Sequence, residues 1–205
     1  MINMQKGIMI IFFIFLIVAC SMPETKIYSI YVPIESKTVN GKTDNSVTIV
    51  VHAPRYLTQP YIAYRESPYQ LKISKYSKWD ASPSEIVRGG FKDSLSSTDI
   101  FQEVRISNTV PRDFYSLTVN LKRFERYDEG KDSFGELVMD VDLLSPDARE
   151  LYRSSISKRV RLDDQSFLSL AKGLSSALAE GISEARSNVI QSLISEGESK
   201  TQLVH

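Results

Sequence analysis

The sequence predicts an α+β fold: a mixed or antiparallel β-sheet that ends in a three-strand meander and is packed by two helices. Residues 115–162 hold three segments in which apolar side chains occupy alternate positions, a pattern typical of strands with one buried face. A capping signature predicts the first helix at about 82–98. Apolar residues recurring at three- and four-residue steps predict the second helix at about 166–194.

The composition is that of one domain with a balanced charge. The chain has 205 residues, of which 25 are basic and 25 are acidic, so there is no electrostatic basis for binding nucleic acid. Cys20 is the only cysteine, which excludes an intrachain disulfide. The sequence has two histidines and no glycine-rich phosphate-binding loop, and we predict neither a metal nor a cofactor.

The N-terminus has the pattern of a secretory signal peptide. Lys6 precedes an uncharged apolar run from Gly7 to Val18. A membrane-spanning helix needs roughly 20 apolar residues, and here polar and charged residues follow too soon after Cys20. We therefore expect the segment to be cleaved.

The end of this segment indicates a lipid anchor. Ile17, Val18, Ala19 and Cys20 resemble the bacterial lipobox, in which a peptidase cuts before a cysteine whose sulfur carries diacylglycerol. The resemblance implies lipidation of Cys20, which would hold the protein on a membrane without a spanning helix. Ser21 follows the cysteine in place of Asp, and the enterobacterial sorting rule then implies the periplasmic face of the outer membrane, with the inner membrane as the alternative. The other interpretations are an ordinary signal peptide with a chance cysteine and an uncleaved anchor.

The chain accordingly divides into four parts. These are a lipoprotein signal peptide at 1–19, a lipidated tether at 20–26, one folded domain at 27–194 and a flexible tail at 195–205.

The domain begins with β structure. We expect a first strand at 27–33 and, after a polar loop, a second at 46–53, whose nearly continuous β-branched run suits a strand buried on both faces near the centre of the sheet. A short hairpin formed by 61–65 and 69–74 then leads to Trp79, which we expect to be buried beside a helix.

The first helix has a clear start. Ser82 can cap it, Pro83 suits its first position, and Glu85 completes a capping box. The pair Gly89-Gly90 inside the helix costs about 1 kcal/mol per glycine relative to alanine. We expect close packing of this helix against the sheet to be the reason.

The meander and the closing helix complete the domain. A strand at 100–107 returns from the first helix, and the three long strands follow at 115–126, 134–144 and 150–162. Phe124 lies on the wrong parity for its strand, which predicts a β-bulge. Asp163 or Asp164 can cap the closing helix.

These landmarks occur in a characteristic order. A lipobox cysteine is followed by a buried strand running into Pro54-Arg55-Tyr56-Leu57, by Pro60-Tyr61-Ile62-Ala63-Tyr64-Arg65, by Trp79 just before a helix, by a strand ending Phe124-Glu125, and by a long helix of Ala, Leu and Ser. The order resembles the auxiliary lipoproteins of ABC-type transporters (PqiC-like) over about Ile27 to Ile194.

The resemblance implies a non-enzymatic component of an intermembrane lipid transport system. Such lipoproteins work beside a periplasm-spanning protein with mammalian-cell-entry (MCE) domains and, through it, an ABC permease and its ATPase. The lipoprotein would dock the MCE protein to the outer membrane, with a ring of identical subunits as a further expectation.

Five residues form a candidate partner interface: Arg55, Tyr56, Tyr61, Tyr64 and Arg65. Arginine and aromatic side chains near strand ends are typical of protein interfaces. The alternative is local packing, in which each tyrosine buries its ring and leaves its hydroxyl in water.

Two other functions are compatible with the sequence. A periplasmic lipid-binding carrier would need an apolar cavity. A periplasmic hydrolase would need His52 beside a hydroxyl and a carboxylate. Asp140 and Asp142 project from one strand face, where we expect them to pair with Arg159 and Arg161 across the meander instead of forming a carboxylate pair for catalysis.

Overall fold

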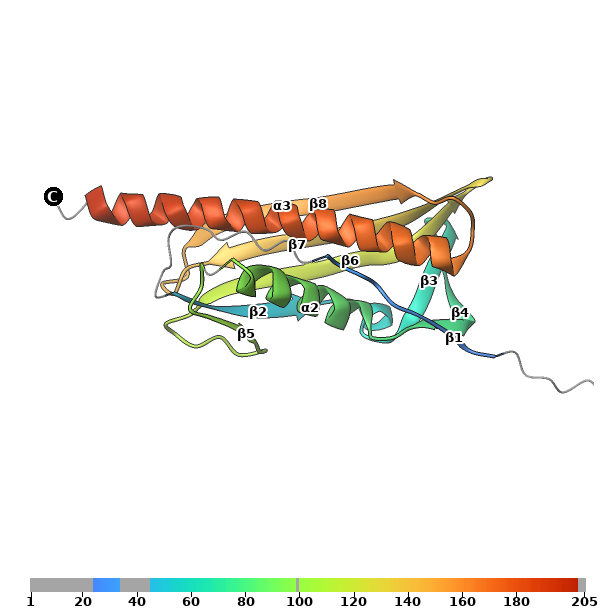
Figure 1. Ribbon diagram of the computed structural model, residues 1–205, viewed down its shortest axis with the longest axis horizontal. Helices are drawn as coiled ribbons and strands as arrows, with labels where there is room; N and C mark the ends of the chain where they lie inside the picture. Colours follow the sequence, from blue (N-terminus) through green and yellow to red (C-terminus); the bar gives the residue numbers. More distant parts are fainter. Residues whose placement is uncertain (1–23, 34–44, 99, 203–205) are drawn as a thin grey trace, which may run out of the picture.

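The computed structural model describes residues 24–33, 45–98 and 100–202. One mixed sheet carries both helices on the same face, with the longer helix running the length of the molecule (Figure 1). This arrangement is the predicted α+β class. The predicted signal peptide, Cys20 and Ser21 lie outside the described residues.

The sheet has eight strands. Their bounds are β1 (Lys26–Tyr28), β2 (Ser46–His52), β3 (Tyr61–Ser67), β4 (Gln70–Trp79), β5 (Glu103–Ile106), β6 (Tyr115–Glu129), β7 (Asp132–Leu144) and β8 (Glu150–Arg161). The main path runs β1-β4-β3-β6-β2-β5, and β7 and β8 continue from the other edge of β6. The meander of β6, β7 and β8 is antiparallel as predicted, whereas β2 pairs in parallel with both β5 and β6.

The second strand is buried on both faces, as its composition predicts. Val47 to Val51 are all buried, and β2 lies between β5 and β6. The first strand is shorter than predicted. It ends at Tyr28, because the chain then leaves the sheet and the backbone N–H of Tyr31 donates to Ser175 Oγ of the long helix at 3.0 Å.

The predicted bulge is present in β6. The register between β6 and β7 shifts between Leu121 and Arg123, which brings Phe124 to the core side, where its ring meets that of Trp79 edge-on at a centroid distance of 5.8 Å. Trp79 is 2% exposed, so its predicted burial is confirmed.

Helix α2 (Pro83–Ser96) begins with the predicted capping box. The Ser82 hydroxyl accepts from the backbone N–H of Glu85, and the Glu85 carboxylate accepts from the backbone N–H of Ser82. The prediction that the glycine pair allows close packing against the sheet is wrong, because the close contact is with the second helix. A Cβ on Gly90 would lie 2.6 Å from Ile182 Cδ1 of the second helix, while one on Gly89 would meet nothing within 4 Å. Gly90 therefore allows α2 to approach another helix, not the sheet.

Helix α3 (Phe167–Gln202) begins where predicted but differs from its prediction in its capping residue and in its end. Its first turn is capped by Ser166, whose Oγ accepts from the backbone N–H of Ser169 at 3.1 Å, and Asp164 instead accepts from the backbone N–H of Ser166 at 2.8 Å. The helix does not end at Ile194, and the segment from 195 predicted as a flexible tail is helical to Gln202. The reason is Glu196, which is buried and accepts from the Tyr115 hydroxyl at 2.9 Å and from Arg149 at 2.8 Å.

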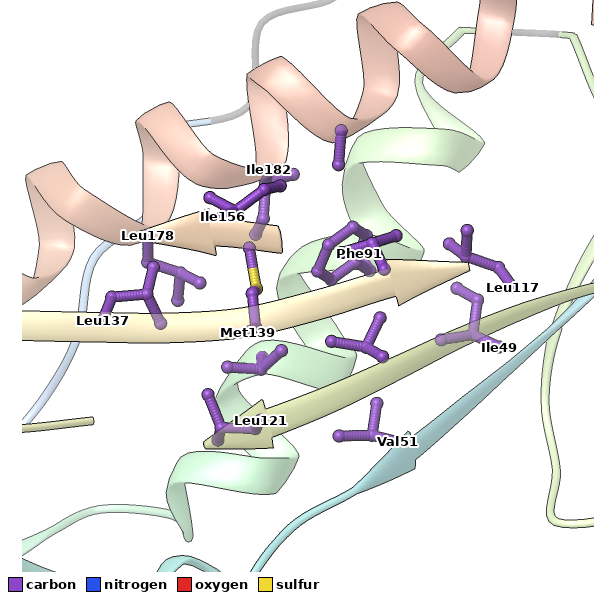
Figure 2. Packing of buried hydrophobic residues seen from close by; sticks show 14 of the residues in the cluster. Ile49, Val51, Phe91, Leu117, Leu121, Leu137, Met139, Ile156, Leu178 and Ile182 are labelled. Atoms are coloured by element: carbon purple, nitrogen blue, oxygen red, sulfur yellow. The ribbon is translucent and has the colours of Figure 1, made fainter. Parts of the chain in front are cut away.

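The core lies between the sheet and the two helices. Figure 2 shows Leu121, Leu137 and Met139 projecting from the strands toward Phe91 of α2 and Ile182 of α3. These side chains belong to one cluster, so the meander, α2 and α3 share a single core.

The two neighbouring glycines of α2 should respond in opposite ways to substitution. Gly89→Ala should raise the free energy of unfolding by about 0.5–1 kcal/mol, because alanine is the better helix former and its methyl group has open space. Gly90→Val should lower it by about 1–3 kcal/mol, because the side chain meets Ile182 Cδ1 where α2 and α3 approach each other. Chemical denaturation of the two variants measures both effects, and equal effects would contradict the close helix crossing.

Candidate functional site

The five candidate interface residues surround β3, but the structure divides them among three environments. Tyr56 belongs to a short 3₁₀ helix, η1 (Arg55–Leu57), which follows β2. Tyr56 and Arg65 meet at one buried carboxylate, Tyr64 packs toward α3, and Arg55 and Tyr61 stay exposed.

The carboxylate is that of Glu125 in β6, which is fully buried. The Nε of Arg65 donates to its Oε1 at 2.6 Å, and the hydroxyl of Tyr56 lies 3.1 Å from its Oε2. A buried carboxylate is costly unless it is paired and hydrogen-bonded. Arg65 and Tyr56 meet that need from two separate segments, and they thereby fix β3 and η1 against β6.

Burial also changes the acidity of Tyr56. Loss of water around its hydroxyl, and next the negative charge of Glu125, raise the pKa of Tyr56 from 10.0 to about 12. At neutral pH the hydroxyl is therefore a hydrogen-bond donor to the carboxylate.

The same face of the sheet carries further paired charges. Arg123 contacts Glu136 at 3.0 Å, and Arg159 contacts Glu129 at 2.8 Å. With Arg65, these arginines line a hollow of about 270 Å³. Each of the three has a carboxylate partner, so the hollow offers no surplus positive charge to an anion.

Tyr64 lies on the opposite face of β3, in a cluster centred on Arg126. The guanidinium of Arg126 is 5.0 Å from the ring centroid of Tyr64 and 5.2 Å from that of Phe167, at the start of α3. It also donates to Asp128 Oδ2 from Nε at 3.2 Å and from Nη2 at 3.0 Å, and to the carbonyl oxygen of Gln165. The arginine therefore attaches the first turn of α3 to the sheet.

Sequence reasoning missed Glu125 and Arg126 as organising residues. Both are buried although they are charged. The signal in the sequence is the run of charged residues beside Phe124, inside a strand whose other residues alternate. Buried charges at such a place require partners, but the partners come from β3, η1 and α3, which are far away in the sequence.

The charged meander face forms ion pairs as predicted, but the partners differ. Asp140 pairs with Lys122, and Asp142 with Arg153 at 2.6 Å. The antiparallel register explains the difference, because it places Ser155 opposite Asp140 and Arg153 opposite Asp142. Arg159 and Arg161 lie farther along β8 and pair with Glu129 and Asp132.

His52 is exposed at the end of β2, and its side chain makes no hydrogen bond or ion pair with the described residues. The carboxylate and the hydroxyl that a hydrolase would place beside it are therefore missing from the described surroundings. Within residues 24–33, 45–98 and 100–202, no cluster of three or more metal-ligating side chains is found, and no helix is long and apolar enough to cross a membrane.

A groove of about 440 Å³ lies between α2 and α3, beside Val32 and Pro33. Its lining mixes apolar atoms of Ile182 with charged residues such as Asp93 and Glu180. A pocket for lipid tails is predominantly apolar, so this groove does not by itself favour a lipid carrier.

Removing the arginine that neutralises Glu125 should be costly. Arg65→Ala should lower the free energy of unfolding by about 3–5 kcal/mol, because it leaves a buried carboxylate without its ion pair. The matched control is Arg105→Ala, which breaks an exposed pair with Glu103 and should cost no more than about 1 kcal/mol. Chemical denaturation separates the two, and similar costs would rule out the proposed importance of the buried pair.

Two tyrosines should make the fold sensitive to alkali. Tyr115 resembles Tyr56, because burial and then its hydrogen bond to Glu196 raise its pKa to about 12. Both stay protonated in the folded state after the unfolded chain has begun to lose the protons near pH 10, so their contribution is complete below about pH 10 and is lost as pH rises toward 12.

A urea denaturation series from pH 9 to about 12 tests this prediction. Tyr56→Phe/Tyr115→Phe should lose less stability across the interval than the parent protein does. Tyr69→Phe is the control, because Tyr69 is 96% exposed. A slope unchanged by the double substitution would contradict the assignment.

Two solved structures resemble this fold over most of the chain. No curated protein matches the chain. A protein of the DUF330 family from Xanthomonas campestris has a similar crystal structure, with a TM-score of 0.73 and 16% identity over 86% of this chain and 99% of that one. A second, uncharacterized protein gives a TM-score of 0.62 and 15% identity over 81% of this chain and 99% of that one.

A less similar structure is a PelC dodecamer from Paraburkholderia phytofirmans. Its TM-score is 0.46, with 14% identity over 75% of this chain and 92% of that one. At 15–16% identity, the two structures with TM-scores of 0.73 and 0.62 support the fold alone.

The family assignment comes from the sequence model for the ABC-type transport auxiliary lipoprotein component, which matches residues 28–184. The match begins at the last residue of β1 and ends halfway along α3, so it includes β2 to β8, α2 and the first half of α3. The chain belongs to the family of ABC-type transport auxiliary lipoproteins.

Proposed function

We propose that this transport-associated lipoprotein docks a periplasm-spanning MCE protein to the outer membrane and thereby couples it to an ABC permease and ATPase. The observation that carries the proposal is the family match over 28–184, directly after a lipobox ending in Cys20. The family is one of transport auxiliary lipoproteins and not of enzymes. The protein's contribution would then be attachment and positioning.

The geometry around β3 supports a revised form of the candidate interface. Arg55 and Tyr61 are the two exposed members. Tyr56, Tyr64 and Arg65 act behind them, because their contacts with Glu125 and Arg126 hold η1 and β3 in place. An arginine and a tyrosine on a rigid support are typical of the few residues that dominate binding energy at an interface.

The membrane and the assembly state complete the proposal. Ser21 after Cys20 favours the outer membrane over the inner membrane. A ring of identical subunits would present several copies of the β3 region to one MCE assembly, and binding through several copies is stronger than binding through one.

Crosslinking of the native, membrane-anchored protein in cells, followed by mass spectrometry, tests the docking role. We expect recovery of an MCE-domain protein, loss of that recovery in Cys20→Ala, and a reduction of about tenfold or more in Arg55→Glu/Tyr61→Ala if these residues are binding hot spots. Arg105→Glu, on β5 at the other end of the sheet, is the matched control for an exposed arginine (Figure 1).

Two outcomes would contradict the proposal. Recovery of bound lipid without any MCE-domain protein would favour the carrier. Unchanged recovery in Arg55→Glu/Tyr61→Ala would remove the β3 region from the interface.

A further inference from the structure

Three large apolar side chains are exposed together at one end of the sheet. Ile27 is 68% exposed, Ile73 40% and Tyr61 37%. In the sheet, Ile27 is opposite Lys78, Lys78 is opposite Tyr61, and Ile73 is opposite Ala63. Paired residues share a face, as do residues two apart in one strand. The register therefore places Ile27, Lys78 and Tyr61 on one face. The pairing of β3 with β4 shifts between Tyr61 and Ala63, and the alternation along β3 then places Ile73, opposite Ala63, on the same face as Tyr61.

This face is the one that α2 and α3 leave uncovered. The ring of Tyr28, the residue after Ile27, packs edge-on against Phe167 of α3 at 6.3 Å. Because successive side chains of a strand point to opposite faces, Ile27 points away from the helices. The same reasoning applies to β3, where Tyr64 packs on Phe167 while Tyr61 has the opposite parity.

Two of the three strands that carry this surface, β1 and β4, are basic. Together β1 and β4 contain four lysines and no carboxylate. Lys72 pairs with Glu66. Lys78 lies between Ile27 and Tyr61 in the register. Lys75 is exposed on the same strand. Exposed apolar and aromatic side chains mixed with lysine are typical of surfaces that lie at the headgroup level of a membrane.

The position of the predicted anchor brings this surface to a membrane. Ile27 follows Cys20 by seven positions, and at 3.3–3.6 Å per position the two residues are at most about 25 Å apart. Helix α3 alone, with 36 residues, is about 54 Å long. A lipid on Cys20 therefore keeps β1 close to the bilayer, whereas the far end of the molecule need not approach it.

We propose that the surface of Ile27, Tyr61, Ile73, Lys75 and Lys78, the β1–β4 surface, rests on the anionic phospholipid leaflet that holds the anchor. The apolar side chains enter the headgroup region and the lysine amines contact lipid phosphates. This contact with lipid orients the domain, because the β1–β4 surface then holds the protein on the membrane together with the lipid anchor at Cys20. The inference rests on the lipidation that forms part of the proposed function.

The test uses the lipidated protein in vesicles of phosphatidylethanolamine and phosphatidylglycerol, after mass spectrometry has verified the acyl chains on Cys20. Because the sequence has no other cysteine, Ile73→Cys accepts a single environment-sensitive fluorophore. The matched control is Ile106→Cys, since Ile106 is 39% exposed and belongs to β5, which lies at the opposite end of the sheet (Figure 1).

We expect the fluorophore at position 73 to be protected from aqueous iodide by about threefold or more relative to position 106, because the headgroup region excludes the anion. Lys75→Glu/Lys78→Glu in the Ile73→Cys background should abolish the protection. Lys92→Glu/Arg112→Glu changes the net charge equally at other exposed positions and should not. Equal quenching at 73 and 106 would overturn the proposal and leave the surface available to a protein.

This outcome is independent of the docking role. Protection at position 73 in vesicles does not require an MCE protein. Failure of crosslinking in cells with protection intact would therefore contradict the proposed function alone, while crosslinking without protection would contradict the membrane surface alone.

Discussion

The attachment of α3 to the sheet is the constraint on which the rest of the structure depends. The helix packs its apolar side on β7 and β8, and Gly181 lets it approach so closely that a Cβ there would lie 3.0 Å from Met139 Cε. Buried charges hold both of its ends: Arg126 contacts Phe167 in the first turn, and Glu196 binds Tyr115 and Arg149 near the last turns. A long helix fixed in this way covers the apolar face of the meander. Among the described residues, no helix covers the opposite face of the sheet.

The open face is consequently rich in paired charges. Asp142 with Arg153 and Arg123 with Glu136 are neighbours on adjacent strands, where opposite charges stabilise the pairing modestly. Glu125 differs because it is fully buried. Its partners are Tyr56 of η1 and Arg65 of β3, the strand that pairs with β6 in parallel. This one carboxylate therefore links η1 and β3 to the meander.

The sequence predicted the elements well where local patterns decide them. The capping box at Ser82, the doubly buried run at Val47–Val51 and the alternation of the meander each follow from neighbouring residues. The errors concern partners distant in sequence. The end of α3 depends on the docking of Glu196, and the role of Gly90 depends on its contact with Ile182. The candidate interface shows the same limit, because no local pattern separates exposed Arg55 from Arg65, which is committed to Glu125.

The position of β1 links the fold to the two proposals. The strand has three residues, yet it pairs with β4 and packs Tyr28 on Phe167, so it joins the predicted tether to both layers of the domain. A pull on a lipid at Cys20 would therefore act on the sheet edge beside Tyr61 and on the start of α3. Tyr61 belongs to both the candidate partner interface and the β1–β4 surface, so the two surfaces meet at this residue. If the leaflet holds Ile27 and Ile73, Arg55 and the partner-facing side of Tyr61 lie beside the membrane, where the end of a bridge between two membranes has to be held.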